Sequence, residues 1–327
     1  MDKAEKSEFF KGYSIKKSIW GVMMIEHSRF KDIPAYNTWK HIEQINQGFS
    51  YDLKYYIMAE DGKEFFLRLS DPSSYDRKKQ EQGIISLIVK RGIPSLQGID
   101  FGTCNNGKNV YMLQTWINGE IFEAALPKLS EDEQYKLGIE AGKILKKIHS
   151  IKSDAINDWY SVRLNQYLSS YKLYKQYSIS YRYEKQINEY IEKNVSILKE
   201  EQISLVHGDY HPGNMVLSPE RTITIIDFDR FDWKAPIEDF YKLAVFSRNI
   251  SIPFCIGQID GYTNDNPSPW FWERYCLCMA MTSFLSLLWG KMRSEEMYLH
   301  RRKLCDILIE DHDCFQSKIP KWYSNYR

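Results

Sequence analysis

The sequence predicts an α+β protein with two lobes, a small strand-rich N-terminal lobe and a larger, mostly helical C-terminal lobe. Two observations predict this class. Runs of β-forming residues separated by turn residues fill the first part of the chain, whereas apolar residues recur at helical spacing after about residue 119. The length of 327 residues also suits two lobes. We expect residues 1–116 to form the first lobe and residues 117–327 the second, with a hinge at about 113–119.

The clearest strand signal is a hairpin in the first lobe. The runs 53–58 and 64–69 are rich in aromatic and aliphatic residues, and they flank the pair Asp61 and Gly62. An Asp-Gly pair between two such runs is a strong indication of a tight hairpin turn. We therefore predict two adjacent antiparallel strands.

One helix and one further strand follow in the first lobe. Segment 77–91 carries an apolar face at helical spacing, and Gly92 and Pro94 end the pattern. Segment 110–117 is a run of β-forming residues followed by a turn pair. This strand leads directly into the predicted hinge.

The second lobe begins with a helix that has a well-defined start. Ser130 and Glu133 have the spacing of a capping box, in which each side chain bonds the backbone N–H of the other residue. The helix that they open ends near residue 149. Further helical patterns occupy 160–200 (two helices), 271–289 and 295–311.

A stripe of aromatic residues marks one face of the first helix in segment 160–200. It consists of Leu164, Tyr167, Leu168, Tyr171 and Tyr174. Such a stripe can form an aromatic cage for a ligand, but it more often packs in the core between helices. We expect core packing.

Composition excludes several classes of protein. Lysine and arginine number 44 against 43 acidic residues, a formal charge of +1, which gives no support to a broad nucleic-acid-binding surface. The longest apolar run, 275–290, is shorter than the roughly 20 residues of a membrane span, so we expect a buried helix there. The chain start lacks a secretory signal pattern, and the six cysteines form no C-x-x-C pair. We therefore expect a cytoplasmic protein with reduced thiols and no zinc site.

The segment 206–214 and the residues near Asp227 carry the chemistry. Asp209 precedes Asn214 by five positions, and Asp227 follows a short apolar run that reads as a buried strand. This pattern suits phosphoryl transfer, in which one carboxylate orients a hydroxyl while an amide and a second carboxylate hold Mg²⁺. The alternative is a polar turn, in which Asp209 and Asn214 cap backbone groups and Asp227 ends a strand.

At these residues the chain resembles the aminoglycoside phosphotransferase and choline kinase superfamily, over about residues 39–289. The resemblance implies a protein-kinase-like fold and ATP and Mg²⁺ as co-substrate and cofactor. It implies that Asp209 is the catalytic base and that Asn214 and Asp227 are the Mg²⁺ ligands. Homoserine kinase-like and spore-coat-related proteins belong to the same superfamily, so a structural protein with a kinase-like fold is the alternative function.

The resemblance also assigns nucleotide contacts in the first lobe. Arg68 occupies the strand position of the phosphate-binding lysine and would pair with Glu81 on the following helix; the alternative is an ordinary surface ion pair. Segment 47–50, with Gly48 and Ser50, is either a loop that covers the phosphates or a simple hairpin turn. Gln114 and Trp116 would lie at the hinge beside the adenine, although Trp116 could equally belong to the core.

Several residues depart from the kinase pattern. Arginine in place of lysine changes the geometry and hydration of the phosphate contact. Phe66 lies on the same strand face as Arg68 and would crowd or stack on a base. After Asp227 the chain continues with Phe228, Asp229 and Arg230 rather than with the D-F-G of protein kinases.

Two histidines and a later aspartate also belong to the predicted catalytic region. We expect His207 to brace the loop through hydrogen bonds rather than to act in catalysis. His211 has two open roles, loop bracing or contact with phosphate or substrate. Asp239 is a further expected loop-bracing residue.

The predicted acceptor is a hydroxyl group of a small molecule, such as an aminoglycoside, amino sugar, amino alcohol or hydroxy amino acid. A cationic acceptor would suit the acidic residues around and after the catalytic hairpin. These are Asp229, Asp232, Glu238, Asp260, Asp265 and Glu273. Arg230 and Arg248 would instead favour an anionic or zwitterionic hydroxy compound.

Overall fold

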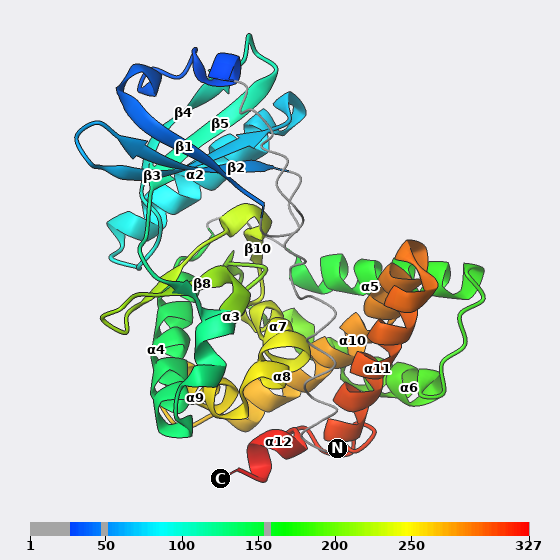
Figure 1. Ribbon diagram of the computed structural model, residues 1–327. Helices are drawn as coiled ribbons and strands as arrows, with labels where there is room; N and C mark the ends of the chain where they lie inside the picture. The colour runs from blue at the N-terminus through cyan, green and yellow to red at the C-terminus, as the bar shows by residue number, and fades with distance from the viewer. Residues whose placement is uncertain (1–26, 47–51, 154–157, 327) are drawn as a thin grey trace.

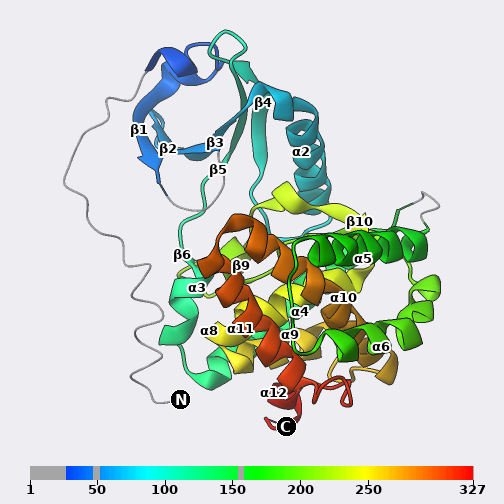
Figure 2. The same cartoon turned by 90° about the vertical axis from the view of Figure 1, so that its right-hand side faces the viewer.

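The computed structural model describes residues 27–46, 52–153 and 158–326. Figures 1 and 2 show the predicted two lobes, with a sheet and one helix on one side and a larger body of helices on the other. The α+β prediction is therefore confirmed. The segments 1–26, 47–51 and 154–157 lie outside the described residues, so Gly48 and Ser50 do too.

The first lobe is built on an antiparallel sheet with the strand order β1-β2-β3-β5-β4. Its strands are β1 (Trp39–Ile45), β2 (Leu53–Ala59), β3 (Glu64–Ser70), β4 (Gly98–Cys104) and β5 (Asn109–Thr115). The predicted hairpin is confirmed as β2 and β3, and Gly62 in its turn has a φ of 81°. A residue without a Cβ adopts this backbone conformation without strain.

Helix α2 (Tyr75–Lys90) lies against this sheet and extends toward the second lobe, as Figure 2 shows. Its end agrees with the predicted stop, since Gly92 has a φ of 68°. The opposite face of the sheet has a small core of its own, in which Phe30 and Ile33 pack against Tyr55 and Ile57.

The second lobe consists of helices joined by short segments. Its longer helices are α4 (Glu131–His149), α5 (Trp159–Gln176), α6 (Glu184–Asn194), α9 (Ile252–Thr263), α10 (Pro269–Arg293) and α11 (Glu295–Asp311). The capping box of Ser130 and Glu133 is present. Ser251, Ser268 and Ser294 each accept a hydrogen bond from a backbone N–H three residues later, and so define three further helix starts.

The aromatic stripe of α5 packs in the core, as predicted. The rings of Tyr167, Tyr171 and Tyr174 all lie within 6.2 Å of the Phe284 ring on α10, measured between ring centroids. The prediction was wrong for Leu168, which is exposed. The stripe of side chains facing α10 is therefore narrower than the apolar pattern suggested.

Helix α10 is longer than the apolar run that predicted it. By length and composition alone it could cross a membrane, but 78% of its most apolar window is buried inside the protein. It contacts α5, α6 and α11, which makes it the central helix of the second lobe. The expected buried helix is thus confirmed.

Two small sheets of the second lobe position the candidate site. One has the order β6-β8-β9, with β6 (Glu120–Ile121), β8 (Met215–Leu217) and β9 (Ile223–Ile225). The other pairs β7 (Ser204–Val206) with β10 (Asp232–Lys234). The predicted catalytic loop runs from β7 to β8, and Asp227 follows β9 by two residues.

Candidate active site

Hydrogen bonds between its backbone and buried side chains hold the loop that follows β7. The backbone N–H groups of His207 and Gly208 donate to the two carboxylate oxygens of Asp239, at 2.8 and 2.7 Å. The His207 ring nitrogen Nε2 lies 3.0 Å from the carbonyl oxygen of Ile226. Both residues therefore brace the loop, as the sequence predicted for His207 and Asp239.

Gly208 is required by the path of this loop. Its φ is 78°, and a Cβ built on it would stand 2.1 Å from the carbonyl oxygen of Arg230. Any larger residue would therefore be strained and would also collide with backbone. The close approach joins the loop to the segment that follows Asp227.

Asp209, Asn214 and Asp227 come together through the backbone. The Asn214 side-chain amide donates to the carbonyl oxygen of Asp209 at 2.9 Å, and the backbone N–H of Ile226 donates to the carbonyl oxygen of Asn214 at 3.0 Å. Asp227 follows directly in a left-handed conformation, with φ 63° and ψ 66°. Three residues spread over 19 sequence positions are thus brought together by these contacts.

Asn214 and Asp227 fit the chemistry of a magnesium site. The Asn214 amide nitrogen is used in the bond to Asp209, which leaves its side-chain oxygen for another partner. The Asp227 carboxylate is 41% exposed, and its Oδ1 lies 3.9 Å from Arg68 Nη1. Hard oxygen donors of this kind suit Mg²⁺, which usually takes its remaining ligands from water and phosphate. The described residues contain no cluster of three His, Cys, Asp or Glu that could hold a metal alone.

Arg68 and Glu81 form a buried ion pair rather than a surface one. Arg68 Nη1 lies 2.7 Å from Glu81 Oε1, and the two side chains are 5% and 0% exposed. Arg68 also donates to Asp52 Oδ2 through Nε and Nη2, at 3.2 and 2.7 Å. The surface-pair interpretation was therefore wrong. The predicted contact with nucleotide phosphates stays a prediction.

A second cation, which the sequence analysis missed, joins this group. Lys78 Nζ lies 3.0 Å from Asp52, 3.3 Å from Glu81 and 2.8 Å from Asp229. Burial alone would raise the pKa of Asp52. Arg68 and Lys78 together lower it by more than burial raises it, so that the pKa falls to about 2. The i,i+3 spacing of Lys78 and Glu81 was the available signal. We call Asp52, Arg68, Lys78, Glu81 and Asp229 the interlobe charge cluster.

Arg77 fastens the two lobes beside this cluster. Its guanidinium donates to the carbonyl oxygens of Asp229 and Phe231 at 2.6 and 2.7 Å, and it lies 3.9 Å from the centre of the Phe231 ring. Arg77 belongs to α2, whereas Asp229 and Phe231 follow β9. This contact joins α2 of the first lobe to the segment that follows Asp227 in the second.

The predicted hinge residues Gln114 and Trp116 lie at the end of β5 and just after it, in different environments. Gln114 is buried in β5, and the backbone N–H of Trp116 donates to the carbonyl oxygen of Glu64 at 3.2 Å. The Trp116 ring lies 4.9 Å from Tyr56 and 6.5 Å from Phe66, between centroids, and is partly exposed. Trp116 is therefore not a core residue. The adenine contact stays a prediction for both hinge residues.

Basic side chains surround the Asp209 carboxylate. Lys242 Nζ lies 2.7 Å from Oδ1, His211 Nε2 lies 3.5 Å from the same oxygen, and Arg230 Nε lies 3.7 Å from Oδ2. Burial raises the pKa of Asp209, but Lys242, His211 and Arg230 together bring it below its usual value. Asp209 is therefore ionised at neutral pH. No local pattern indicates Lys242, which comes from a distant segment.

His211 braces the loop, which is one of its two predicted roles, and its contact with phosphate or substrate stays a prediction. Its Nδ1 accepts a hydrogen bond from the backbone N–H of Gly213 at 3.1 Å, which braces the loop. Its other nitrogen faces Asp209. Burial lowers the pKa of His211 to about 4, so the ring is neutral at pH 7.

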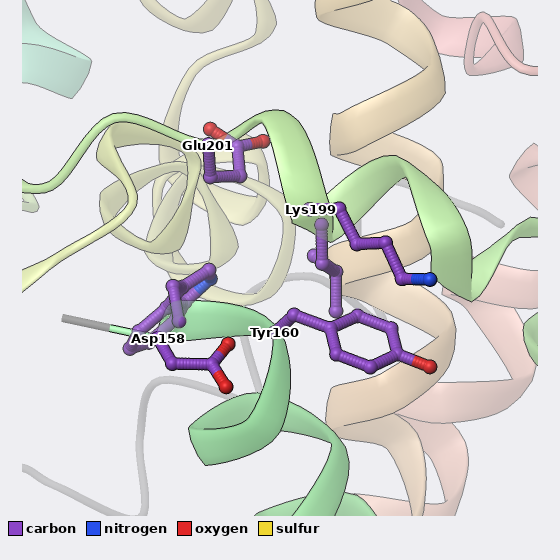
Figure 3. A pocket seen from close by; sticks show the side chains of 6 residues that line it. Asp158, Tyr160, Lys199 and Glu201 are labelled. Carbon is purple, nitrogen blue, oxygen red and sulfur yellow. The ribbon is translucent and has the colours of Figure 1, made fainter.

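Two cavities lie outside this site. One has a volume of about 360 Å³ and is lined by the start of α5 and the segment around Lys199; Figure 3 shows Asp158 and Tyr160 on one side of it and Lys199 on another. The other, of about 450 Å³, lies beside Tyr135 and Tyr326 in the second lobe. Neither is lined by the predicted catalytic, metal-binding or nucleotide-binding residues, and the second is lined by Asp260, one of the acidic residues considered for a cationic acceptor.

Comparison with known proteins agrees with the geometry. The model of a family described as the phosphotransferase enzyme family matches residues 41–275. No curated protein sequence matches the chain. The fold is similar to that of the gentamicin complex of APH(2″)-IIa, with a TM-score of 0.59 and 16% identity over 93% of this chain and 96% of that chain.

Two further solved structures share this fold. The ADP-bound aminoglycoside phosphotransferase APH(2″)-Ib has a TM-score of 0.59 and 16% identity over 99% of each chain. The GDP and kanamycin complex of APH(2″)-IIIa has a TM-score of 0.64 and 15% identity over 86% of this chain and 96% of that chain. At these identities the likeness concerns the fold.

Proposed function

The chain belongs to the phosphotransferase enzyme family, and we propose that it transfers the γ-phosphate of ATP to a hydroxyl group of a small molecule. The observation that carries this proposal is the convergence of Asp209, Asn214 and Asp227 through the hydrogen bonds described above. A polar turn that only caps backbone groups would not require Asp227 to stand beside Asn214.

Asp209 would orient the acceptor hydroxyl and take its proton. The hydroxyl oxygen would form a bond to the γ-phosphorus, the bond from that phosphorus to the bridging β–γ oxygen would break, and ADP would leave with the electron pair. Because the pKa of Asp209 is lowered, it is a weak base and would accept the proton late in the reaction. Lys242 would hold the carboxylate in place.

Asn214 and Asp227 would hold Mg²⁺, as their donor atoms suit. When bound, the ion supplies positive charge that offsets the charge of the phosphate oxygens. Arg68 and Lys78 are the cations that we propose for the other phosphates, because both lie in the interlobe charge cluster within reach of Asp227 or Asp229.

We propose that the hinge and the loop with Gly48 and Ser50 make the remaining contacts with the nucleotide. β5 belongs to the sheet of the first lobe and β6 to a sheet of the second, so residues 113–119 are the proposed hinge and lobe boundary. Gln114 and Trp116 would lie beside the adenine, and Gly48 and Ser50 would cover the phosphates.

Substitution of Asp209 tests the proposed function. We expect Mg·ATP to bind the protein in calorimetry, and a library of hydroxylated amines, sugars and amino acids to include an acceptor of phosphate. Asp209→Asn should lower kcat by at least about 100-fold, because general-base catalysis contributes about 10²–10⁴-fold. The matched control is Asp232→Asn, since Asp232 is exposed and pairs with Lys234 at 3.0 Å.

A structural protein with a kinase-like fold is the competing function. Absence of Mg·ATP binding would favour it. Nucleotide binding with full activity in Asp209→Asn would instead show that the base has been assigned to the wrong residue.

A further inference from the structure

The Asp209 carboxylate is outnumbered by the cations around it. Lys242 and Arg230 both approach it, at 2.7 and 3.7 Å, and Lys242 is largely buried. One negative charge therefore faces two positive charges, of which Lys242 is 15% exposed and Arg230 is 64% exposed. Asp209 offsets the charge of the buried Lys242, and the additional positive charge of Arg230 on the solvent side suits a second anion.

The Phe246 ring extends this basic surface to a third cation. Lys242 Nζ lies 4.8 Å from the ring centre, and Arg301 Cζ lies 5.7 Å from it. The His211 ring stacks on the same ring at 5.3 Å. Three separate parts of the chain thus meet at Phe246: the catalytic loop, the segment after β10, and α11.

Arg301 has hydrogen-bonding capacity that the described residues leave unused. Its Nε is buried and has no hydrogen-bond partner among them. Its guanidinium rests on the Trp289 ring at 4.6 Å instead of on a carboxylate. A planar guanidinium held on an aromatic face is well suited to bind a carboxylate or phosphate group.

Five of the six acidic residues that could have favoured a cationic acceptor are engaged elsewhere, and the sixth, Asp265, is exposed just after the end of α9. The other five have partners: Asp229 with Lys78 at 2.8 Å, Asp232 with Lys234 at 3.0 Å, Glu238 with Arg163 at 2.9 Å, Glu273 with Lys318 at 2.6 Å, and Asp260 with Tyr135 and Tyr323 at 2.9 and 2.7 Å. One other carboxylate, Glu123, approaches the catalytic loop at Gly213.

Resting on the proposed function, we propose that the acceptor alcohol carries an anionic group, a carboxylate or a phosphate. Arg301 binds this group, and Lys242 and Arg230 add to the positive field around it. The three cations could instead serve only the terminal phosphate of the nucleotide. Arg301 separates the two cases. It lies against the Phe246 ring, at 5.7 Å from the ring centre, and makes no ion pair with Asp209 among the described contacts.

Matched sets of probes test the charge preference. The full-length protein, saturated with Mg²⁺ and a non-hydrolysable ATP analogue, is titrated in a calorimeter with glucuronate, glucose and glucosamine, and with glycerate, glycerol and aminopropanediol. Within each set the ring or chain is shared and only the charge differs. We expect the anionic member to bind about tenfold more tightly than the neutral member, as for a charge-assisted hydrogen bond.

A variant of Arg301 tests the residue. Arg301→Gln should weaken binding of the anionic probe about tenfold and leave the neutral probe and the ATP analogue unchanged. Arg302→Gln is the matched control, because the next residue of a helix projects about 100° away. It should retain the preference for the anionic probe.

Each other outcome overturns the inference. It fails if the ammonium probes bind as tightly as the anionic ones, if no probe binds, or if Arg301→Gln and Arg302→Gln behave alike. Failure of the proposed function is distinct, because it would appear as loss of binding by the ATP analogue itself in the unmodified protein.

Discussion

Arg68 binds two carboxylates at once, and this explains why arginine suits a position where protein kinases have lysine. Its Nη1 faces Glu81, while Nε and Nη2 both face Asp52. An ammonium group lacks this planar fork. In this protein the compact cation of the cluster is Lys78, which contacts Asp52, Glu81 and Asp229. The two cations are therefore complementary parts of one network.

Removal of Arg68 should destabilise the protein strongly. Arg68→Met would leave Lys78 as the only close cation for Asp52 and Glu81 among the contacts described here. Breaking a buried pair in this way costs about 3 kcal/mol of unfolding free energy. Urea denaturation measures the change. Lys63→Met is the control, because its pair with Asp61 is exposed and screened by solvent, so its loss should change the unfolding free energy much less. Equal effects of the two substitutions would contradict the argument.

The packing of α4 against α9 depends on glycines at the crossing point. A Cβ on Gly138 or Gly142 of α4 would stand 2.3 or 2.2 Å from a carbonyl oxygen of α9, and Gly257 and Gly261 of α9 face α4 in the same way, at 2.1 Å. Glycine normally weakens a helix, so four glycines at one crossing serve close approach. Helix α4 also positions the catalytic loop, because the Tyr210 hydroxyl donates to the carbonyl oxygen of Ala141 at 2.7 Å.

An alanine in this crossing should therefore separate the two helices. We expect Gly142→Ala to lower the unfolding free energy by about 2 kcal/mol, the usual range for overpacking. Gly83→Ala in α2 is the matched control, because it is exposed and a Cβ there meets nothing within 4 Å. The control should stabilise the protein by about 1 kcal/mol through helix propensity. Thermal unfolding of both variants gives the comparison, and a stabilising Gly142→Ala would refute the role of the crossing.

Elements with strong local signals were predictable, and those that depend on distant partners were not. The β2–β3 hairpin and the capping box of α4 follow from neighbouring residues. Strand β4 was missed because Gly98 and Gly102 interrupt its apolar pattern, and its pairing with β5 supplies what the local sequence lacks. Helix α9 was missed for the same reason, since its glycines are favourable only against α4.

The candidate site divides in the same way. The spacing of Asp209 and Asn214 lies within one loop and is visible in the sequence. The contact of Lys78 with Asp229 joins residues 151 positions apart, and Lys242 reaches Asp209 from another segment. Such ionic partners are chosen by the tertiary fold, because lysine and aspartate occur throughout the surface of any soluble domain.

Buried histidines should make the whole molecule sensitive to acid. Burial lowers the pKa of both His211 and His312 to about 4. The unfolded chain takes up these protons near pH 6.5, so it binds more protons than the folded protein between pH 6.5 and 4. Stability must therefore fall as the pH falls through this window, by about 3 kcal/mol for each histidine. Burial raises the pKa of Asp311 to about 6, which opposes the change by a similar amount.

Two histidines against one aspartate leave a net loss of about 3 kcal/mol between pH 6.5 and 4, measurable by urea denaturation at several pH values. His312→Asn should flatten this dependence, because an amide can keep the 3.0 Å bond to the Ser317 carbonyl oxygen but does not titrate. His41→Asn is the control, since it makes the same chemical change at a half-exposed histidine and leaves the two buried histidines in place. If His312→Asn kept the full acid sensitivity, the burial of His312 would not be its cause.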